Sequence, residues 1–480
     1  MDPYDRKRWG LSLPAIRKMG DRLVAFWERY SPCFRTQTRD GSDYAHKYLS
    51  GLLRMTEQRN FTNIGRQTGV AGQNVQHFMS HSPWSASAVI EQVQQELMRL
   101  PGLPPGGMLL LDESACKKAG DQSAGAGRQH NGRMGSVQMS QVGTFLAYGN
   151  GPLWTWIDGE LFLPEHWFTP KMAKLRKRLG IPKARKFATK IQLGWQMIQR
   201  VRQHGVTFEA VGCDTLYGRS VWLRRQMAGA GIWYMAEVPA DTHVYVTPPV
   251  VGIPKKKKSR GRDFTRPRVV SKEKPVEVRD LARRPDTIWS RVCVRTTERG
   301  ELNDEFAVRR VWTTHAGEPP VEEWLVMRRH SDGDLTYALS NAPADTSRER
   351  LAWLKCQRYF IECANQDAKS QAGWDELRAQ KYLAWEHHLA LTILATWFIA
   401  QTKWDWAQQF SRDPKLAAQF QTDVLPALSA ANVRELLRAA MPLPQLTPEG
   451  AADLVVEHLI NRTRARISRL KSQHKSNQPP

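Results

Sequence analysis

Two aspartates stand where an α/β protein could use them as metal ligands. Asp112 follows the apolar run 108–111, and Asp214 follows the apolar segment 208–213. Runs of this kind predict buried strands, and ligands bind outside the carboxyl ends of strands in α/β sheets. If the two strands lie side by side, their carboxylates can hold hard cations, because magnesium prefers oxygen ligands.

A third acid, Glu362, lies in the segment RYFIECANQDAKSQAG. Arg358, Glu362 and Lys369 are spaced by four and seven residues, which predicts one shared helix face. Such a face suits a phosphate backbone, because Glu362 would bind metal while Arg358 and Lys369 contact phosphate oxygens. Two magnesium ions about 3.5–4 Å apart activate an attacking oxygen and stabilise the leaving one in phosphodiester chemistry.

Each of these features has a simpler interpretation when it is taken alone. Asp112 or Asp214 could be a turn acid or a helix cap, and the spacing of Arg358, Glu362 and Lys369 is typical of an exposed, salt-bridged helix face. The combination of the three acids in order, with a basic β-prone segment before the third, favours a catalytic site.

The pattern around these residues predicts five regions. Residues 1–105 are expected to be helical. Within them, segments 60–67 and 73–79 outline a helix-turn-helix, although a plain helical subdomain is an equal alternative. The breaker cluster PGLPPGG at 101–107 marks a boundary. The further regions are an α/β core from 106 to 238, a β-rich basic insertion from 239 to 345, a second part of the core from 346 to 405, and a helical C-terminal region with a basic tail from 406 to 480.

The charge balance indicates a polyanionic partner. The chain has 480 residues, with 70 Lys and Arg against 47 Asp and Glu, and a net charge of +23. Nucleic acid is the expected partner, although a merely basic protein is the alternative. Beyond Arg358 and Lys369, the candidate phosphate contacts are Lys117, Lys118, Arg128 and the basic run Lys255, Lys256, Lys257, Lys258, Arg260 and Arg262.

The remaining composition indicates a reduced, intracellular protein. The six cysteines form no CxxC pair, which argues against a zinc ribbon and favours free thiols in a cytosol. We identify no signal peptide, and the apolar run 389–400 is too short to span a bilayer. His387 and His388 are adjacent on a predicted helix, so they lack the spacing of a helical metal pair and are expected to be structural.

These blocks together resemble the DDE transposases of bacterial insertion sequences, of the DDE superfamily endonuclease type. The similar segments are LLLDESACKKAG around Asp112, GCDTLYG around Asp214, and the long block that begins at RYFIECANQDAKSQAG. The resemblance implies an RNase H-like mixed sheet with flanking helices, interrupted by a β-rich insertion. It implies that Asp112, Asp214 and Glu362 are the catalytic metal ligands, with Arg358 and Lys369 completing an Arg-x3-Glu-x6-Lys signature.

The resemblance also implies an activity and its partners. Two Mg²⁺ ions, for which Mn²⁺ can substitute, would serve DNA cleavage at transposon ends and strand transfer into target DNA. The expected state is a homodimer on DNA in the bacterial cytoplasm. Related enzymes often form a hairpin intermediate, in which Trp289, Trp312 or Trp324 could stack on a flipped base, although each is more simply a strand core residue.

The chain departs from this family pattern at three positions. Lys355 stands where the signature has a Tyr, and Cys363 and Ala364 replace bulkier or more polar residues. A catalytically inactive, transposase-derived DNA-binding protein and a nuclease that cuts without joining are the alternatives.

Overall fold

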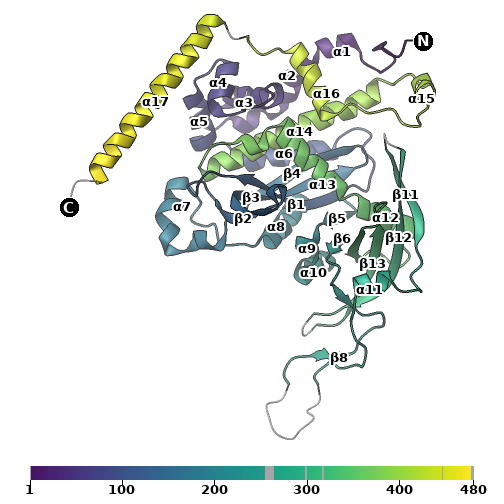
Figure 1. The fold of residues 1–480 in the computed structure, drawn as a ribbon. Coiled ribbons are helices and arrows are strands. Elements are labelled where there is room, and N and C mark those ends of the chain that lie inside the picture. Colours follow the sequence, from purple (N-terminus) through teal and green to yellow (C-terminus); the bar gives the residue numbers. More distant parts are fainter. Residues whose placement is uncertain (1, 255–263, 298–299, 316–317, 446, 477–480) are drawn as a thin grey trace. The chain divides into compact units, whose positions relative to one another are not determined.

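The computed structural model describes residues 2–254, 264–297, 300–315, 318–445 and 447–476. It divides into two compact units, Met1–Met441 and Pro442–Pro480. The described residues of the second unit contain one helix, α17 (Pro448–Ser476). The larger unit contains the described strands β1 to β14 and the helices α1 to α16 (Figure 1), and its residue range includes the three acids.

The N-terminal part of the larger unit is helical, as predicted. Asn60 caps the helix that follows it by accepting a hydrogen bond from the Asn63 backbone, and Gly69, with φ of +73°, ends that helix. Glycine adopts this left-handed conformation without steric cost. The expected helix pair is therefore present, and its DNA-binding role stays a prediction. The helices are α1 (Leu13–Arg17), α2 (Met19–Tyr30), α3 (Ser42–Arg54), α4 (Phe61–Thr68), α5 (Gly72–His81) and α6 (Ala86–Met98).

A mixed sheet forms the centre of the unit, which confirms the α/β fold class expected for an RNase H-like core. Its central order is β4–β3–β1–β5–β6, with β1 antiparallel to β3 and parallel to β5. The first six strands are β1 (Met108–Lys117), β2 (Gly127–Asn131), β3 (Ser136–Asn150), β4 (Leu153–Leu161), β5 (Ala210–Cys213) and β6 (Trp233–Val238).

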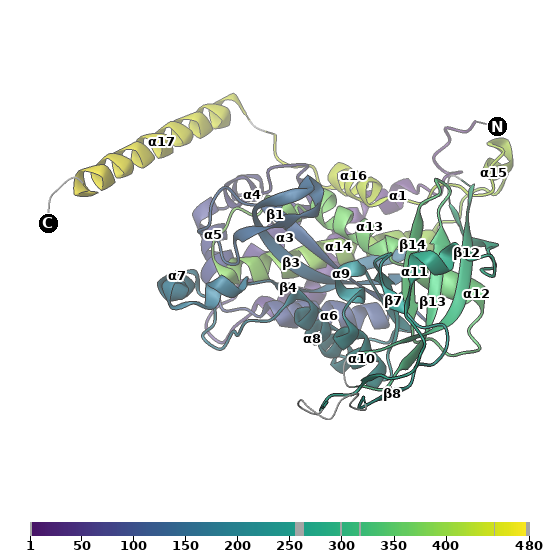
Figure 2. The ribbon, with the colours of Figure 1, turned by 60° about the horizontal axis from the view of Figure 1, so that its bottom comes forward.

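Helices cover both faces of this sheet (Figure 2). Leu111 of β1 packs against Gly194 of α8 (Lys190–Gln203), whereas its neighbour Leu110 and the α13 residue Phe360 meet at Gly149. Successive strand residues point to opposite faces. Asp112 therefore points, like Leu110, toward α13 (Tyr359–Gln366).

The predicted β-rich segment continues the core sheet. Strand β14 pairs antiparallel with β6, which places β11 to β14 in the same ten-stranded sheet. An apolar cluster that includes Val244, Leu281, Val311, Leu325 and Leu339 forms the core of this part. The elements are β7 (His243–Val244), β8 (Val251–Gly252), β9 (Arg268–Val269), β10 (Val276–Glu277), α11 (Val278–Ala282), β11 (Ser290–Thr297), β12 (Gly300–Thr313), β13 (Val321–Arg329) and β14 (Leu335–Ser340).

The remaining helices flank the sheet or follow it. The longest of them in the larger unit, α14 (Tyr382–Gln409), is buried along most of its length. Within the described residues, we find no helix with the length and apolarity to cross a membrane. The other helices are α7 (Ala173–Leu179), α9 (Thr215–Gly218), α10 (Val221–Gly229), α12 (Arg348–Cys356), α15 (Lys415–Gln419) and α16 (Ala430–Ala440), with short turns η1 (Ser31–Phe34), η2 (Gly132–Met134), η3 (Glu165–Phe168), η4 (Pro170–Met172), η5 (Asp367–Gln371) and η6 (Trp374–Glu376).

Candidate active site

Asp112 and Asp214 lie at equivalent positions on neighbouring parallel strands. Leu111 of β1 is opposite Cys213 of β5, and each aspartate is the next residue. Asp214 ends its strand and caps α9, because its Oδ1 accepts hydrogen bonds from the backbone N–H groups of Leu216 and Tyr217, at 3.0 and 3.3 Å. The prediction that β5 stops at this acid is confirmed.

The same prediction is wrong for Asp112, which lies inside its strand. β1 continues to Lys117 because residues 112–117 pair with the long strand β3, with Asp112 opposite Phe145. This extension carries β1 beyond the end of β5. Consequently Asp112 and Asp214 remain neighbours, while the next five residues of β1 form a wall beyond them.

The two aspartates are partly buried and have no salt-bridge partner of their own among the described residues. Burial raises the pKa of Asp112 to about 7, and the nearby negative charge of Asp214 adds to this effect. Burial also raises the pKa of Asp214, although the Tyr217 backbone hydrogen bond opposes the shift. Two adjacent acids with raised pKa values constitute an arrangement that a bound cation would stabilise.

Glu362 lies on α13, one helical turn before a residue that reaches Asp112. The Asn365 amide donates to Asp112 Oδ2 at 3.3 Å, and Glu362 precedes Asn365 by three residues. The Glu362 carboxylate itself accepts a hydrogen bond from the Arg358 guanidinium at 2.7 Å, and its side chain is 53% exposed. Among the described residues, we find no cluster of three His, Cys, Asp or Glu side chains close enough to hold a metal ion.

Arg358 links the three acids to a fourth carboxylate. Its Nε lies 3.1 Å from Glu237 Oε2 in β6, and its positive charge also interacts with Asp112. Burial would lower the pKa of Arg358, but the surrounding carboxylates outweigh it and raise this pKa above its ordinary value. Arg358 thus bridges Glu237 and Glu362 and offsets part of the negative charge of Asp112.

Glu237 is a site residue that the sequence reasoning missed. It is the acid within the otherwise apolar strand β6, and this was the available signal. Its second oxygen pairs with the Lys355 ammonium at 3.2 Å, and the Lys355 side chain is only 1% exposed. The departure of Lys355 from the family pattern is therefore accompanied by a buried ion pair.

Glu362 and Lys369 line one cavity of about 580 Å³, together with Thr56 and Asn365. Lys369 lies in η5, a π-helical turn that adds a residue to the helical repeat after α13. Glu362 therefore contacts Arg358 on one side and shares a cavity with Lys369 on the other. A common face for all three residues stays a prediction.

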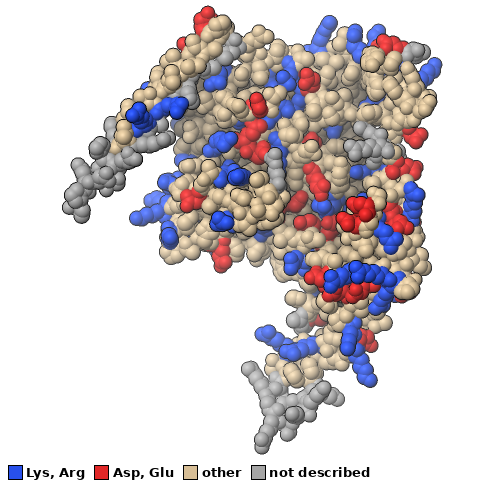
Figure 3. All heavy atoms as spheres, in the orientation of Figure 1, with Lys and Arg blue, Asp and Glu red and all other residues tan. Residues whose placement is uncertain are grey.

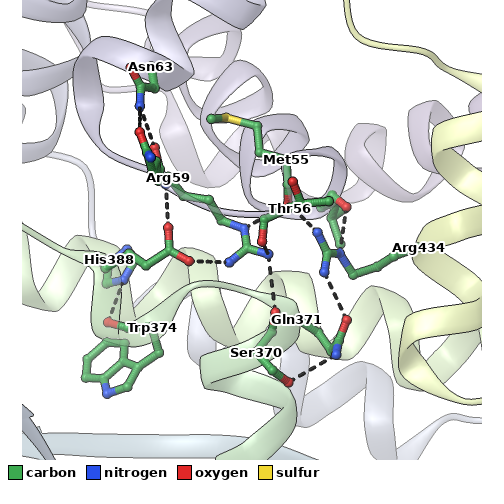
Figure 4. A network of polar contacts seen from close by, with 12 residues as sticks. Met55, Thr56, Arg59, Asn63, Ser370, Gln371, Trp374, His388 and Arg434 are labelled. Atoms are coloured by element: carbon green, nitrogen blue, oxygen red, sulfur yellow. Dashed lines mark hydrogen bonds and ion pairs between the residues drawn. The ribbon is translucent and has the colours of Figure 1, made fainter.

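A buried polar network fixes the segment that follows Lys369 (Figure 4). Arg59, whose side chain is 1% exposed, pairs with Glu376 at 2.7 Å and donates to the carbonyls of Met55, Thr56 and Ser370. Arg434 of α16 adds hydrogen bonds to Leu53, Met55 and Gln371. The loop before the α4–α5 pair is therefore fastened to the wall of the Glu362 cavity.

Comparison with known proteins identifies the family of the chain. The family model of the DDE superfamily endonucleases matches residues 29–301, more than half of the chain. The chain belongs to the DDE superfamily endonuclease family. The matched residues of this DDE endonuclease include Asp112 and Asp214, whereas Glu362 lies beyond them.

A curated relative gives the same family assignment. The probable transposase for insertion sequence element IS701 from Microchaete diplosiphon is 25% identical over 201 residues. The match covers 41% of this chain and 49% of that protein, so the chain spans about half the length of the relative. The resemblance to insertion-sequence DDE transposases is confirmed at the level of the family.

The acidic side chains fit the divalent metals that DDE endonucleases generally use. Asp112 and Asp214 supply the oxygen ligands that hard cations prefer, in a place where burial disfavours two uncompensated charges. One oxygen of the Glu362 carboxylate is engaged by Arg358, and the three acids do not form a closed group of metal ligands among the described residues. The fit is therefore good for the two aspartates, and Glu362 lies near them on α13.

The remaining candidate residues of the DDE endonuclease lie at different places. Lys117 and Lys118 line a second cavity, Arg128 is exposed on β2, and Lys255, Lys256, Lys257, Lys258, Arg260 and Arg262 lie outside the described residues. Figure 3 shows basic and acidic side chains interspersed on one face, with basic ones gathered over α7.

The two histidines are structural, as expected. His387 contacts the backbone carbonyls of Met79 and Trp84, and His388 contacts Tyr48 and the Trp374 carbonyl. Burial lowers the pKa of both to about 4, so they are neutral in the core.

The three tryptophans of the β-rich segment are half-buried on strands or beside them. Arg329 lies over the Trp289 ring at 4.1 Å from its centroid, and Arg310 over Trp324 at 4.9 Å. A stacking role for Trp289, Trp312 or Trp324 stays a prediction.

Proposed function

We propose that this chain is a DNA transposase that cleaves DNA at transposon ends and joins those ends to target DNA. The observation that carries the proposal is the side-by-side position of Asp112 and Asp214, one residue past a matched pair on parallel strands. Membership of the DDE superfamily endonucleases and the similarity to a probable transposase support it. The protein would work in the cytoplasm as a homodimer on DNA.

Asp112, Asp214 and Glu362 are the residues that would hold two Mg²⁺ ions, with Mn²⁺ as a substitute. Bound there, the metal would supply Lewis-acid activation of water or of a 3′-hydroxyl and charge stabilisation of the leaving oxygen. The protein contributes fixed carboxylates: Asp214 is held by two backbone N–H groups, and Asp112 by the Asn365 amide. Both cleavage and joining are attacks of an oxygen on phosphorus, so one site can serve both.

Arg358 and Lys369 would orient the DNA backbone in this site. The Arg358 guanidinium is the group that currently neutralises Glu362, and a phosphate offers it the same bidentate geometry as a carboxylate. Transfer of Arg358 from Glu362 to a phosphate would free the glutamate for metal. Binding of the DNA phosphate would therefore favour binding of the metal, and binding of the metal would favour binding of the phosphate.

The test is cleavage of a plasmid that carries the gene's own flanking DNA. Wild type, Asp214→Asn and the exposed control Asp345→Asn are compared in Mg²⁺ and in Mn²⁺, after equal folding is established by thermal melting. We expect the wild type and the control to cut at the element ends and Asp214→Asn to be inactive.

Other outcomes would change the assignment. If all three proteins bind DNA and none cuts it, the chain is a transposase-derived DNA-binding protein. If wild type cuts but never joins, it is a nuclease. Equal cutting by Asp214→Asn would contradict the assignment of the second acid.

A further inference from the structure

A large cleft lies beyond the acids and outside the site described above. It has a volume of about 710 Å³ and lies between the far end of β1, the turn after β2, and the segment 375–380. Asp375 lines both this cleft and the Glu362 cavity, so the cleft and the cavity are adjacent and are separated by the segment around Asp375. A strand of DNA that passes Glu362 would reach the cleft next.

The rim of the cleft carries a net positive charge, with three cations against the carboxylate of Asp375. Lys117 and Arg378 are exposed there, and the Lys118 ammonium is held by the Leu377 carbonyl at 3.0 Å. Three cations around one opening suit the phosphates of a nucleic-acid backbone, whose binding is dominated by such contacts.

A buried amide also lines the cleft. Asn131 is only 3% exposed, and its Oδ1 has no hydrogen-bond partner among the described residues. A buried acceptor without a partner is costly, and most such groups in proteins are satisfied. A turn of the Asn131 side chain toward the cleft would let this amide oxygen accept a hydrogen bond from an exocyclic amine of a nucleobase. Met134, which is 50% exposed, supplies apolar surface nearby.

The wall between the two hollows is firmly held. Arg59 anchors it through Glu376, and Lys118 anchors it through Leu377. Gly373, with φ of +68°, allows this packing, because a Cβ there would lie 2.6 Å from the Arg59 side chain. The cleft is therefore preformed, which lowers the entropic cost of binding a flexible strand.

We propose that this cleft is a binding site for a single-stranded segment of DNA, with phosphates at Lys117, Lys118 and Arg378 and an unpaired base at Asn131. The proposal rests on the proposed function and adds a subsite to it. An unpaired strand is required because Asn131 is buried in the cleft and cannot protrude into the groove of a duplex. The amide favours bases with an exocyclic amine, such as cytosine, over thymine.

The test measures binding of three fluorescent DNA duplexes to the full chain. One is flush, one carries an unpaired deoxycytidine overhang, and one carries an unpaired deoxythymidine overhang. Binding is measured in chelator with Asp214→Asn, which is not expected to cleave. We expect the deoxycytidine overhang to bind about tenfold more tightly than the flush duplex, a difference typical of one or two hydrogen bonds.

Three variants of that protein locate the effect. Arg378→Gln should remove most of the preference for overhangs, while Arg438→Gln, a control on α16, should leave it unchanged. Asn131→Ala should remove the preference for deoxycytidine over deoxythymidine, with folding checked by thermal melting. Arg378 is exposed, so its variant tests the proposal even if Asn131→Ala is unstable.

The outcomes separate this inference from the proposed function. Three outcomes would overturn the single-strand site. They are an equal affinity for flush and overhanging duplexes, an equal loss of affinity for both kinds of duplex in Arg378→Gln, and no DNA binding at all. An overhang preference in a chain that never cleaves would support the cleft and contradict the transposase. Cleavage without a preference for overhangs would support the transposase and contradict the single-strand site.

Discussion

The acid site and the Arg59 network lie beside the same cavity, but they differ in whether their charged groups have partners within the protein. In the network, Arg59 has a carboxylate and three carbonyls as partners, so its charge is satisfied within the protein. In the acid site, Asp112 and Asp214 are neighbours, and burial raises the pKa of both. A protein that only needed stability would not keep two such carboxylates together.

The difference separates a structural site from a functional one. A raised pKa alone would not do so, because burial also raises the pKa of Asp158 to about 6, and Asp158 is paired with Arg200 at 2.8 Å. What distinguishes Asp112 is the combination of a second acid, an incomplete set of partners and a cavity beside it. Substitutions should therefore affect activity in one region and stability in the other.

The largest expected effect is on catalysis. Asp112→Asn should lower the rate of DNA cleavage by about 10³-fold or more, as is typical for an essential catalytic group. It should leave the melting temperature unchanged or higher, because it removes an uncompensated buried charge. Cleavage rate and thermal unfolding are measured on the same preparation. A loss of stability as large as that of an Arg59 variant would show that Asp112 has a structural role, and would contradict the distinction between the two regions.

The next effect is on stability. Arg59→Ala should lower the free energy of unfolding by about 3–5 kcal/mol, because it leaves Glu376 and several carbonyls without their buried partner. Arg438→Ala removes an exposed pair with Glu435 and should cost no more than about 1 kcal/mol. Urea unfolding measures both. If Arg59→Ala keeps full stability, the network is not structural.

A pH dependence should sharpen the contrast. The pKa of Asp112 is about 7 in the folded chain and ordinarily 3.8. Between these values the folded state binds a proton that the unfolded state lacks, so stability falls as pH rises. The decrease in the free energy of unfolding as pH rises should be smaller in Asp112→Asn than in wild type. The control Asp345→Asn should behave like wild type. Parallel stability curves from pH 4 to 7 in chelator would contradict the raised pKa.

The smallest expected effect concerns a single phosphate contact. Lys369→Gln should weaken DNA binding less than tenfold and reduce the slope of log affinity against log salt by about 1. Lys274→Gln, an exposed control in the β-rich segment, should leave the slope unchanged. An unchanged slope for Lys369→Gln would place the DNA backbone elsewhere.

The sequence predicted much of the architecture because its elements have local signals. The helix pair at α4 and α5, the strand β5 that ends before Asp214 and the helix α13 that carries Glu362 follow from periodicity and breaker residues within a few positions. The extent of β1 was missed, because residues 112–117 contain several polar side chains and become a strand by pairing with β3. Pairing between distant segments leaves no periodic signal in the strand itself.

The candidate site divides in the same way. Asp112, Asp214, Glu362 and the Arg358–Lys369 spacing were apparent from residue type and position, and the catalytic roles of these residues stay predictions. Glu237 was missed because its partners Arg358 and Lys355 lie far away in the sequence, with a separation of 118 residues to Lys355.

By itself, the sequence determined that Asp214 stands at a strand end and Glu362 on a helix, and that the chain carries a strong positive charge. The tertiary structure alone decided that β1 and β5 are parallel neighbours, that Arg358 holds Glu362, and that Arg59 meets Glu376 across 317 residues. The physical reason is the separation along the chain over which each interaction acts. Periodicity and capping act within a few residues, whereas charge compensation in a buried site depends on side chains that only folding brings within hydrogen-bonding distance.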